Sequence, residues 1–404
     1  MPRFDLMQNP AAAPGAAYGP VQAAVLNEAG LRQALAVISG WPGYAPTPLL
    51  ELSGLARATG VATIRYKDEG QRFALKSFKP LGGAYAVARL LMAEVPARAG
   101  VDTVTAEDLL AGTFKDICAQ VTVTAATDGN HGRAVAWGAR MFGCKCVIFI
   151  NEAVSEGRER AIASFGADVR RNPGSFDDAV RTTQATAESQ GWHVVPDTTA
   201  GAGGPSPRHV TQGYAVMAAE TIDQLSGTPP PTHLFLQAGV GGMAAATCGQ
   251  FWQAYGARRP KVILVEPENA ACWFASLNAG QPVAVTGDLD TLMGGLACGE
   301  ISRLAWDVLR TGADAAIRLT DQPAADAMRL LARGTDGDVP IAAGESGVAG
   351  LAAYLSVAAD AEARRALALD ETSRIVLFGT EGATDPEMYT EIVGRPPEEI
   401  APPS

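Results

Sequence analysis

Residues 121–150 read VTVTAATDGNHGRAVAWGARMFGCKCVIFI, and this stretch decides the fold. Its β-branched run Val121–Thr124 predicts a strand, and a turn containing glycine follows it. Residues Gly132–Phe142 then predict a helix, and the apolar run Cys146–Ile150 predicts a second, buried strand. A strand, a helix and a further strand in succession indicate a parallel pair of strands joined by a crossover helix.

The same alternation continues along the chain. Further strands are predicted within HVVPD at 193–197 and at Thr232–Gln237, Lys261–Glu266 and Arg374–Phe378. Further helices are predicted at Phe176–Gln190, Gly241–Tyr255 and Ala324–Gly334. Strands that alternate with helices of about ten to fifteen residues predict parallel sheets covered on both faces. The predicted fold class is therefore α/β.

Length and charge restrict the classes of partner. The chain has 404 residues, which suggests two domains at about 150 residues each. With 32 Lys+Arg against 43 Asp+Glu, its formal net charge is −11, and it contains no block of basic residues. This acidic balance argues against a nucleic-acid or anionic-membrane partner. No run of about 18 apolar residues is present, so a membrane-spanning helix is not expected.

The N-terminal twenty residues and the cysteines carry no export or metal signal. Residues 1–20 contain one Arg and several prolines but no apolar run, so we expect a poorly ordered arm and a cytoplasmic protein. The six cysteines lack the C-x-x-C spacing of zinc sites, and no metal is predicted. Reduced thiols are expected, and whether Cys272 pairs with Cys298 is left open.

A lysine precedes two glycines in SFKPLGGAY, residues 77–85. The glycines are expected to open a helix, and the apolar neighbours Phe78 and Leu81 would partly desolvate the amine of Lys79. Desolvation and the positive potential of a helix N-terminus both favour a neutral amine that can form a Schiff base. The alternative is an ordinary surface lysine at the start of a helix.

Two glycine-containing turns follow predicted strands. ATDGNHG at 126–132 and QAGVGGM at 237–243 each precede a predicted helix, where free backbone N–H groups favour an anion. The second turn has Ala244 where a dinucleotide fingerprint needs glycine, and it lacks the Lys of a P-loop. It therefore predicts a cradle for one phosphate monoester, against the alternative of an ordinary tight turn. His131 is interpreted as a packed or capping residue.

Two polar turns lie near the C-terminus, GESG at 344–347 and GTEG at 379–382. The first is not a hydrolase nucleophile elbow, because Val348 replaces the last glycine of that motif. A desolvated lysine, a phosphate cradle and polar turns after parallel strands together describe a pyridoxal-phosphate site.

Seven motifs in order resemble the fold-type-II pyridoxal-phosphate enzymes, and within them the diaminopropionate ammonia-lyases. They are SFKPLGGAYA, ATDGNHGRAVAWGA, LQAGVGGMAAA, VEPENAACW, GGLACGE, GESGVAGL and GTEGATD, and the resemblance extends from about Arg72 to Tyr389. The family implies two domains, each with a central, mostly parallel sheet flanked by helices. The large domain is expected at 1–86 and 212–404, the small one at 87–211, with the cofactor in the cleft between them. A homodimer is also implied.

The resemblance implies roles for individual residues. Lys79 matches the Schiff-base lysine, Asn130 the asparagine at the ring oxygen, and Thr380 the hydroxyl beside the pyridine nitrogen. The remaining cofactor-binding positions are Phe78, Glu345 and the phosphate loop Gly239, Val240, Gly241, Gly242 and Met243. Asp128 and Asp197 match two aspartates of the ammonia-lyases, and Asp128 would act on the substrate face opposite the lysine. The alternative for Asp197 is a cap after a strand.

The implied reaction is α,β-elimination of D- or L-2,3-diaminopropionate to pyruvate and two ammonia, with a lyase for another β-substituted amino acid as an alternative. Amino-acid catabolism is the expected setting, and a biosynthetic role is left open. A dehydratase of the serine/threonine type or a β-replacement synthase is the alternative, and it would carry a hydroxyl at position 128 rather than Asp128. A non-catalytic protein would lack Lys79. The segment Thr198–Val210 departs from the family pattern because it has no aromatic side chain, and its part Thr198–Pro207 is predicted to be a loop that acts as a lid or hinge. The choice of substrate therefore stays open.

Overall fold

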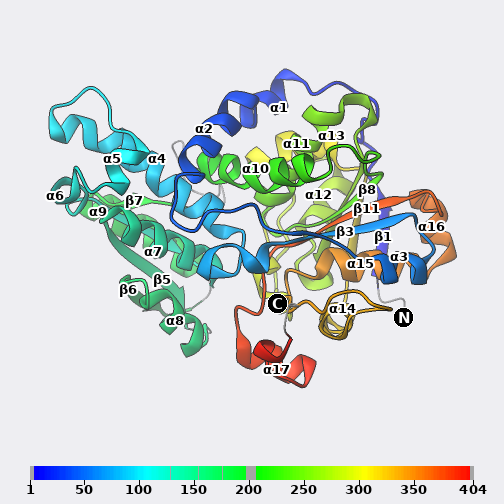
Figure 1. The fold of residues 1–404 in the computed structure, drawn as a ribbon. Helices are drawn as coiled ribbons and strands as arrows, with labels where there is room; N and C mark the ends of the chain where they lie inside the picture. The colour runs from blue at the N-terminus through cyan, green and yellow to red at the C-terminus, as the bar shows by residue number, and fades with distance from the viewer. Residues whose placement is uncertain (1–3, 128, 153, 175, 197–205, 401–404) are drawn as a thin grey trace. The chain divides into compact units, whose positions relative to one another are not determined.

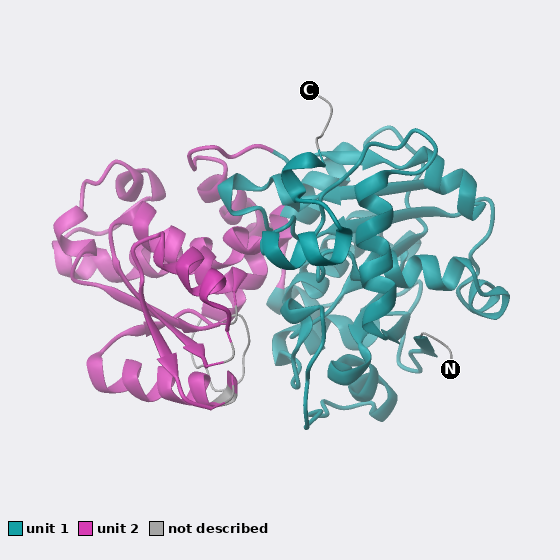
Figure 2. Ribbon diagram, turned by 90° about the horizontal axis from the view of Figure 1, so that it is seen from below, with its two compact units in different colours: residues 1–25, 46–77, 217–404 teal, residues 26–45, 78–216 magenta. Residues whose placement is uncertain are grey.

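The computed structural model describes residues 4–127, 129–152, 154–174, 176–196 and 206–400 (Figure 1). Two units can be distinguished within the chain, and Figure 2 colours them separately. The first comprises residues 1–25, 46–77 and 217–404, and the second comprises residues 26–45 and 78–216. These bounds differ from the expected segments, because residues 26–45, 78–86 and 212–216 belong to the second unit.

The first unit is built on a seven-stranded sheet with the order β1-β10-β9-β8-β11-β3-β2. The strands are β1 Phe4–Gln8, β2 Leu49–Glu51, β3 Thr63–Asp68, β8 His233–Gln237, β9 Lys261–Pro267, β10 Ala315–Leu319 and β11 Arg374–Gly379. The five inner strands run parallel, whereas the edge strands β1 and β2 are antiparallel to their neighbours. The carboxyl ends of β8, β9 and β11 therefore lie at one edge of the sheet.

Helices flank this sheet. They are α1 Pro20–Val25, α3 Ser53–Thr59, α11 Gly242–Tyr255, α12 Cys272–Ala279, α13 Arg303–Gly312, α14 Asp321–Arg333, α15 Ala349–Ala358, α16 Ala361–Leu367 and α17 Pro386–Val393. Every residue of β8 is buried, and so are the last five of β11. Because successive strand residues point to opposite faces, such runs mean that both faces are covered. The predicted α/β class is confirmed.

The second unit contains a four-stranded, fully parallel sheet with the order β6-β5-β4-β7. Its strands are β4 Thr122–Ala126, β5 Lys145–Asn151, β6 Asp168–Asn172 and β7 His193–Val194. Its helices are α2 Glu28–Ile38, α4 Lys79–Ala99, α5 Ala106–Leu110, α6 Lys115–Cys118, α7 Asn130–Phe142, α8 Glu156–Ala163 and α9 Phe176–Gln190. Helix α10, Ser206–Gln224, contains the boundary between the two units. The predicted strand–helix–strand unit at 121–150 is confirmed as β4, α7 and β5.

The N-terminal segment is not the poorly ordered arm that its prolines suggested. Phe4–Gln8 forms strand β1, which pairs antiparallel with β10 from Phe4 opposite Leu319 to Gln8 opposite Ala315. Asn9 extends this attachment, because its side-chain amide donates to the carbonyl of Ala313 at 2.7 Å. An edge strand of five residues gives too short a pattern to be recognised beside a proline-rich stretch.

The loop expected at Thr198–Pro207 is also wrong in part. Residues 197–205 lie outside the described residues, but helix α10 begins at Ser206 and includes Pro207. Proline fits the first turn of a helix because the N–H that it lacks has no acceptor there. Pro207, which suggested a loop, therefore lies in the first turn of a helix.

A buried ionic cluster fixes the segment that leads from β3 toward Lys79. Arg72 pairs with Glu69 at 2.8 Å and with Glu220 of α10 at 2.6 Å, and Lys67 also pairs with Glu220 at 2.8 Å. All four side chains are almost fully buried, so each charge depends on its partner. Removing one partner from such a cluster typically costs about 3–5 kcal/mol.

Among the described residues, no helix combines the length and the apolar character needed to cross a membrane.

Candidate active site

The phosphate loop predicted at 239–243 comprises the turn after β8 and the first two residues of α11. The chain leaves the sheet after Gln237, and Gly241 precedes the first residue of the helix, Gly242. The first N–H groups of a helix have no acceptor within the helix, and the helix dipole adds positive potential there. The loop is thus suited to an anion such as a phosphate monoester.

The side chain of Trp273 packs against this loop. Its indole Nε1–H donates to the carbonyl of Gly239 at 3.0 Å. A Cβ atom added to Gly241 would lie 2.3 Å from the indole ring, and Gly241 also has φ +97°, a left-handed conformation. Glycine is therefore required at 241 both by backbone conformation and by the space that the indole fills.

Glu266 in turn fixes Trp273. The carboxylate of Glu266, at the end of β9, accepts the backbone N–H groups of Trp273 at 2.7 Å and Phe274 at 2.8 Å. The thiol of Cys272 lies 3.5 Å from the same carboxylate. Burial raises the pKa of Glu266 to about 8, although these hydrogen bonds oppose the rise. Glu266 therefore caps α12 and holds the indole against the loop.

Thr380 follows β11 and is brought to the same edge of the sheet. Its side chain is buried, and its Oγ1 accepts a hydrogen bond at 2.8 Å from the side-chain amide of Gln237. Gln237 immediately precedes the phosphate-loop turn. The structure thus brings two predicted positions, the loop 239–243 and Thr380, together around one buried amide.

Glu345 is buried in the turn 344–347, which packs against the segment after Thr380. The N–H of Gly344 donates to the carbonyl of Glu381 at 3.0 Å, and the N–H of Ser346 donates to the Glu381 carboxylate at 3.1 Å. Ser77 forms an antiparallel bridge with the same Glu381. Ser77, two positions before Lys79, therefore pairs with the residue that follows Thr380.

Lys79 is the first residue of α4, in the second unit. The expected helix start at the two glycines is wrong, because Lys79 and Pro80 already form the first turn. Lys79 and Phe78 are half-buried, and Nζ lies 5.5 Å from the centre of the Phe78 ring. Gly82 is explained by packing, since an added Cβ would lie 2.4 Å from the ring of Tyr214.

Asn130 is the first residue of α7, at the carboxyl end of β4. Its side-chain oxygen accepts a hydrogen bond from Arg133 at 3.1 Å. His131 is buried, and its Nε2 lies 2.7 Å from the carbonyl of Val195, as expected for a packed histidine.

The two predicted aspartates, Asp128 and Asp197, lie outside the described residues. Among the described residues no cysteine forms a disulfide, so the structure shows no Cys272–Cys298 bridge. Within the described ranges, no three His, Cys, Asp or Glu side chains gather as metal ligands.

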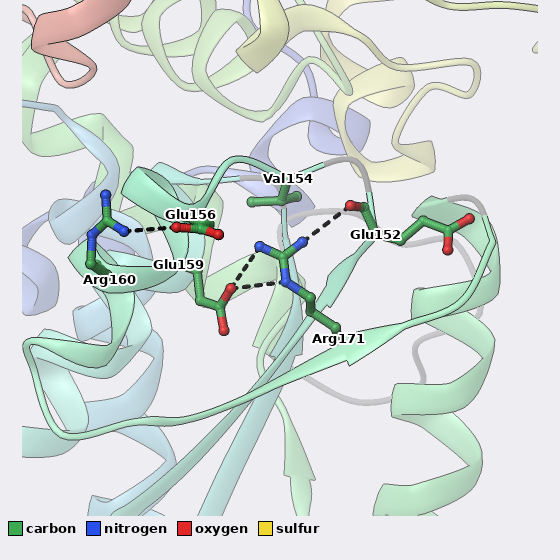
Figure 3. A pocket seen from close by; sticks show the side chains of 6 residues that line it. All are labelled: Glu152, Val154, Glu156, Glu159, Arg160 and Arg171. Atoms are coloured by element: carbon green, nitrogen blue, oxygen red, sulfur yellow. Dashed lines mark hydrogen bonds and ion pairs between the residues drawn. The ribbon is translucent and has the colours of Figure 1, made fainter.

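A surface pocket of about 500 Å³ in the second unit involves none of the predicted residues (Figure 3). It is lined by Glu152, Val154, Glu156, Glu159, Arg160 and Arg171. Arg171 pairs with Glu159 at 2.6 Å, and Arg160 pairs with Glu156 at 3.1 Å. The charges that face this pocket are therefore largely paired with one another, which leaves little to select a ligand.

Three residues of the site could not be identified from the sequence, namely Gln237, Glu266 and Trp273. Each contacts residues distant in the chain or acts through a backbone group. The motifs LQAGVGG and VEPENAACW contain these residues, but a motif alone does not indicate which atoms meet.

Comparisons with known proteins identify the family of this chain. Residues 41–381 match the family model described as pyridoxal-phosphate dependent enzyme. The diaminopropionate ammonia-lyase of Escherichia coli K12 is 38% identical over 364 residues, which cover 89% of this chain and 90% of that protein. The biosynthetic L-threonine dehydratase of Salmonella typhimurium is 29% identical over 59% of this chain.

A solved structure is similar along almost the entire chain. It is the diaminopropionate ammonia-lyase from Escherichia coli in complex with an aminoacrylate-PLP azomethine reaction intermediate, with a TM-score of 0.86 and 35% identity. The match covers 97% of each chain. The fold expected from the motifs is therefore confirmed.

We predict that Gly241→Ala weakens binding of pyridoxal phosphate at least about tenfold, because the added methyl group displaces either the loop or the Trp273 indole. Gly280→Ala is the matched control, since Gly280 has φ +69° but no atom within 4 Å of an added Cβ. Titration of the apoprotein with the cofactor measures both. Equal affinities of the two variants would contradict the role of the loop.

We also predict a pH effect at Glu266. Its folded pKa, about 8, exceeds the ordinary value of 4.5, so the unfolded chain loses this proton first as pH rises. Between those values the free energy of unfolding should fall by up to about 1.4 kcal/mol per pH unit because of this group. Glu266→Gln should remove that slope, whereas Glu268→Gln, at an exposed position, should retain it. Denaturant unfolding at several pH values measures the slopes, and an unchanged slope in Glu266→Gln would show that the hydrogen bonds keep the carboxylate ionised.

Proposed function

We propose that this chain, which belongs to the family of pyridoxal-phosphate-dependent enzymes, eliminates ammonia from 2,3-diaminopropionate to give pyruvate and two ammonia. The observation that carries the proposal is the similarity to an ammonia-lyase over 89% of the chain. The similarity to a threonine dehydratase extends over 59% and is weaker. A diamino substrate is therefore favoured over a hydroxyamino acid.

The described residues fit pyridoxal phosphate. The loop 239–243 is proposed to offer backbone N–H groups to the phosphate, and packing fixes its path, because a Cβ added to Gly239 would lie 3.1 Å from Sγ of Cys298 and one added to Gly241 would lie 2.3 Å from the Trp273 indole. Thr380, whose side chain is buried, is proposed to hydrogen-bond the ring nitrogen, and Asn130 is proposed to be the residue at the ring oxygen, as the family resemblance implies. Phe78 and Glu345 are proposed to line the cofactor. When bound, the cofactor's conjugated ring accepts the electron pair left by removal of the substrate Cα proton.

Lys79 is proposed to be the residue that would hold the cofactor covalently, and its amine would also be the group that accepts the Cα proton of the substrate. Its amine belongs to the first turn of α4, where the helix dipole adds positive potential. The half-buried Phe78 ring beside it limits access of water. A neutral amine is the form that both steps require.

Asp128 and Asp197 are proposed to recognise the second ammonium group of the substrate, which a serine or threonine does not carry. A carboxylate pairs with an ammonium through a charge-assisted hydrogen bond. Asp128 is further proposed to remove the Cα proton of the D-enantiomer, on the face opposite Lys79. Breaking of the bond between Cβ and the β-amine would release the first ammonia, and hydrolysis of the remaining enamine would give pyruvate and the second ammonia.

The oligomeric state and the cellular location are also proposals. We infer a homodimer that works in the cytoplasm, as the family resemblance implies. Light scattering of the purified holoenzyme tests the first of these, and a monomeric mass would contradict it.

The first functional prediction concerns products. Holoenzyme given D- or L-2,3-diaminopropionate should release two ammonia per pyruvate, with L-serine at least about tenfold slower because it lacks the second ammonium. Lys79→Ala should lose the visible absorption band of the lysine-bound cofactor and nearly all turnover, whereas Lys76→Gln, at an exposed neighbour, should retain both. Turnover of serine but not of diaminopropionate would identify a dehydratase instead.

The second concerns the two faces of the substrate. Asp128→Asn keeps the size of the side chain but removes its basicity, so turnover of the D-enantiomer should fall at least about a hundredfold more than that of the L-enantiomer. Steady-state kcat for both enantiomers, on the same cofactor-loaded preparation, measures the ratio. Equal losses would assign Asp128 to binding rather than to proton removal.

A further inference from the structure

Gln237 makes more polar contacts than the end of a strand requires. Its side chain is 3% exposed. Its Nε2 lies 2.7 Å from the carbonyl oxygen of Phe378, 2.8 Å from Oγ1 of Thr380 and 3.1 Å from the carbonyl oxygen of Gly347. One amide group thus joins β8, the turn after β11 and the turn at 344–347.

The orientation of this amide is set by its neighbours. Two of the three partners, the carbonyls of Phe378 and Gly347, can only accept hydrogen bonds. The atom that faces them must therefore be the NH₂ group, and the reverse orientation would place three oxygens against a fourth. The hydroxyl of Thr380 consequently also faces an N–H donor, and its oxygen accepts.

The hydroxyl hydrogen of Thr380 must then point to another acceptor. Among the described residues, the bond accepted from Gln237 is the only hydrogen bond of the Thr380 side chain. A buried hydroxyl hydrogen without an acceptor is costly, since buried polar groups in folded proteins are almost always paired. A ligand atom with a free lone pair fits this position, and a ligand donor does not.

We propose that Gln237 is a positioning residue that orients the hydroxyl of Thr380, so that this hydroxyl donates to an unprotonated pyridine nitrogen of the cofactor. The inference rests on the proposed function in one respect, namely that Thr380 faces that nitrogen. Gln237 does not touch the cofactor in this account. It determines whether the Thr380 hydroxyl presents its hydrogen or its oxygen lone pair to the cofactor. The hydrogen suits an unprotonated pyridine nitrogen, and the lone pair suits a protonated one.

The carbonyl groups explain why the amide is needed. Without Gln237, the carbonyls of Phe378 and Gly347 would lose their donor and would compete for the hydroxyl hydrogen of Thr380. The hydroxyl would then present its oxygen lone pair to the ring nitrogen. This lone pair would repel the lone pair of an unprotonated nitrogen. Gln237→Glu should act similarly despite its size, because a neutral carboxyl group has one donor for three acceptors.

A double-mutant cycle tests the coupling. Gln237→Leu and Thr380→Val should each weaken pyridoxal-phosphate binding by the apoprotein about tenfold, and the double variant should be no weaker than either. Gln250→Leu removes another buried amide of the first unit and should leave the affinity unchanged. Independent losses that multiply to about a hundredfold in the double variant would overturn the proposal.

A spectroscopic measurement tests the direction of the hydrogen bond without any substrate. With cofactor labelled with ¹⁵N in its ring, the wild-type resonance should report an unprotonated, hydrogen-bonded nitrogen at every pH from about 6 to 9. In Gln237→Leu and Gln237→Glu it should shift toward a nitrogen without that bond, and Thr380→Ser should preserve the wild-type value. A wild-type resonance unaffected by Thr380→Val, or one typical of a protonated ring, would overturn the proposal.

The two measurements separate this inference from the proposed reaction. Cofactor affinity and the ¹⁵N resonance are recorded on protein without an amino acid, so they stand even if diaminopropionate is not the substrate. Should Gln237→Leu fail to fold, as circular dichroism would show, Gln237→Glu supplies the same comparison at nearly unchanged volume.

Discussion

The site depends on the parallel pairing of β8 with β9 and β11 in the first unit. Residues Leu234, Val262 and Val376 lie side by side across these three strands, and all three strands run in the same direction. The carboxyl ends of these strands therefore lie at one edge of the sheet. The phosphate loop, Glu266 and Thr380 are located at that edge. Crevices at the carboxyl ends of parallel strands are where open α/β sheets bind ligands. Sequence segments more than a hundred residues apart thus form one site.

Buried polar groups hold this edge in a fixed geometry. Glu266 fixes the backbone of Trp273, whose indole supports Gly239 and limits position 241 to glycine. Gln237, at the end of β8, donates a hydrogen bond to Thr380 in the turn after β11. Because leaving any of these groups unpaired costs about 1–3 kcal/mol, the arrangement is stable before a cofactor enters. A site built in advance spends less of its binding free energy on ordering the protein.

Many helices and strands could be predicted from the sequence, but the contacts between residues distant in the chain could not. The helices predicted at Phe176–Gln190 and Gly241–Tyr255 correspond to α9 and α11, because strong local patterns mark them. Strand β1 was missed because its pairing with β10 is set by residues about 310 positions away. Gln237 was missed for the same reason, since its partners lie 110 to 143 residues along the chain. A periodicity reports local structure, whereas these contacts are set by topology.

Hydrogen–deuterium exchange of the apoprotein, with and without pyridoxal phosphate, tests most directly whether the turns after β8 and β11 hold one ligand. Backbone amides at 239–243 and at 378–381 should slow together on addition of the cofactor, because the loop binds its phosphate and the Thr380 turn binds its ring. Protection of one segment without the other, or of neither, would contradict the account.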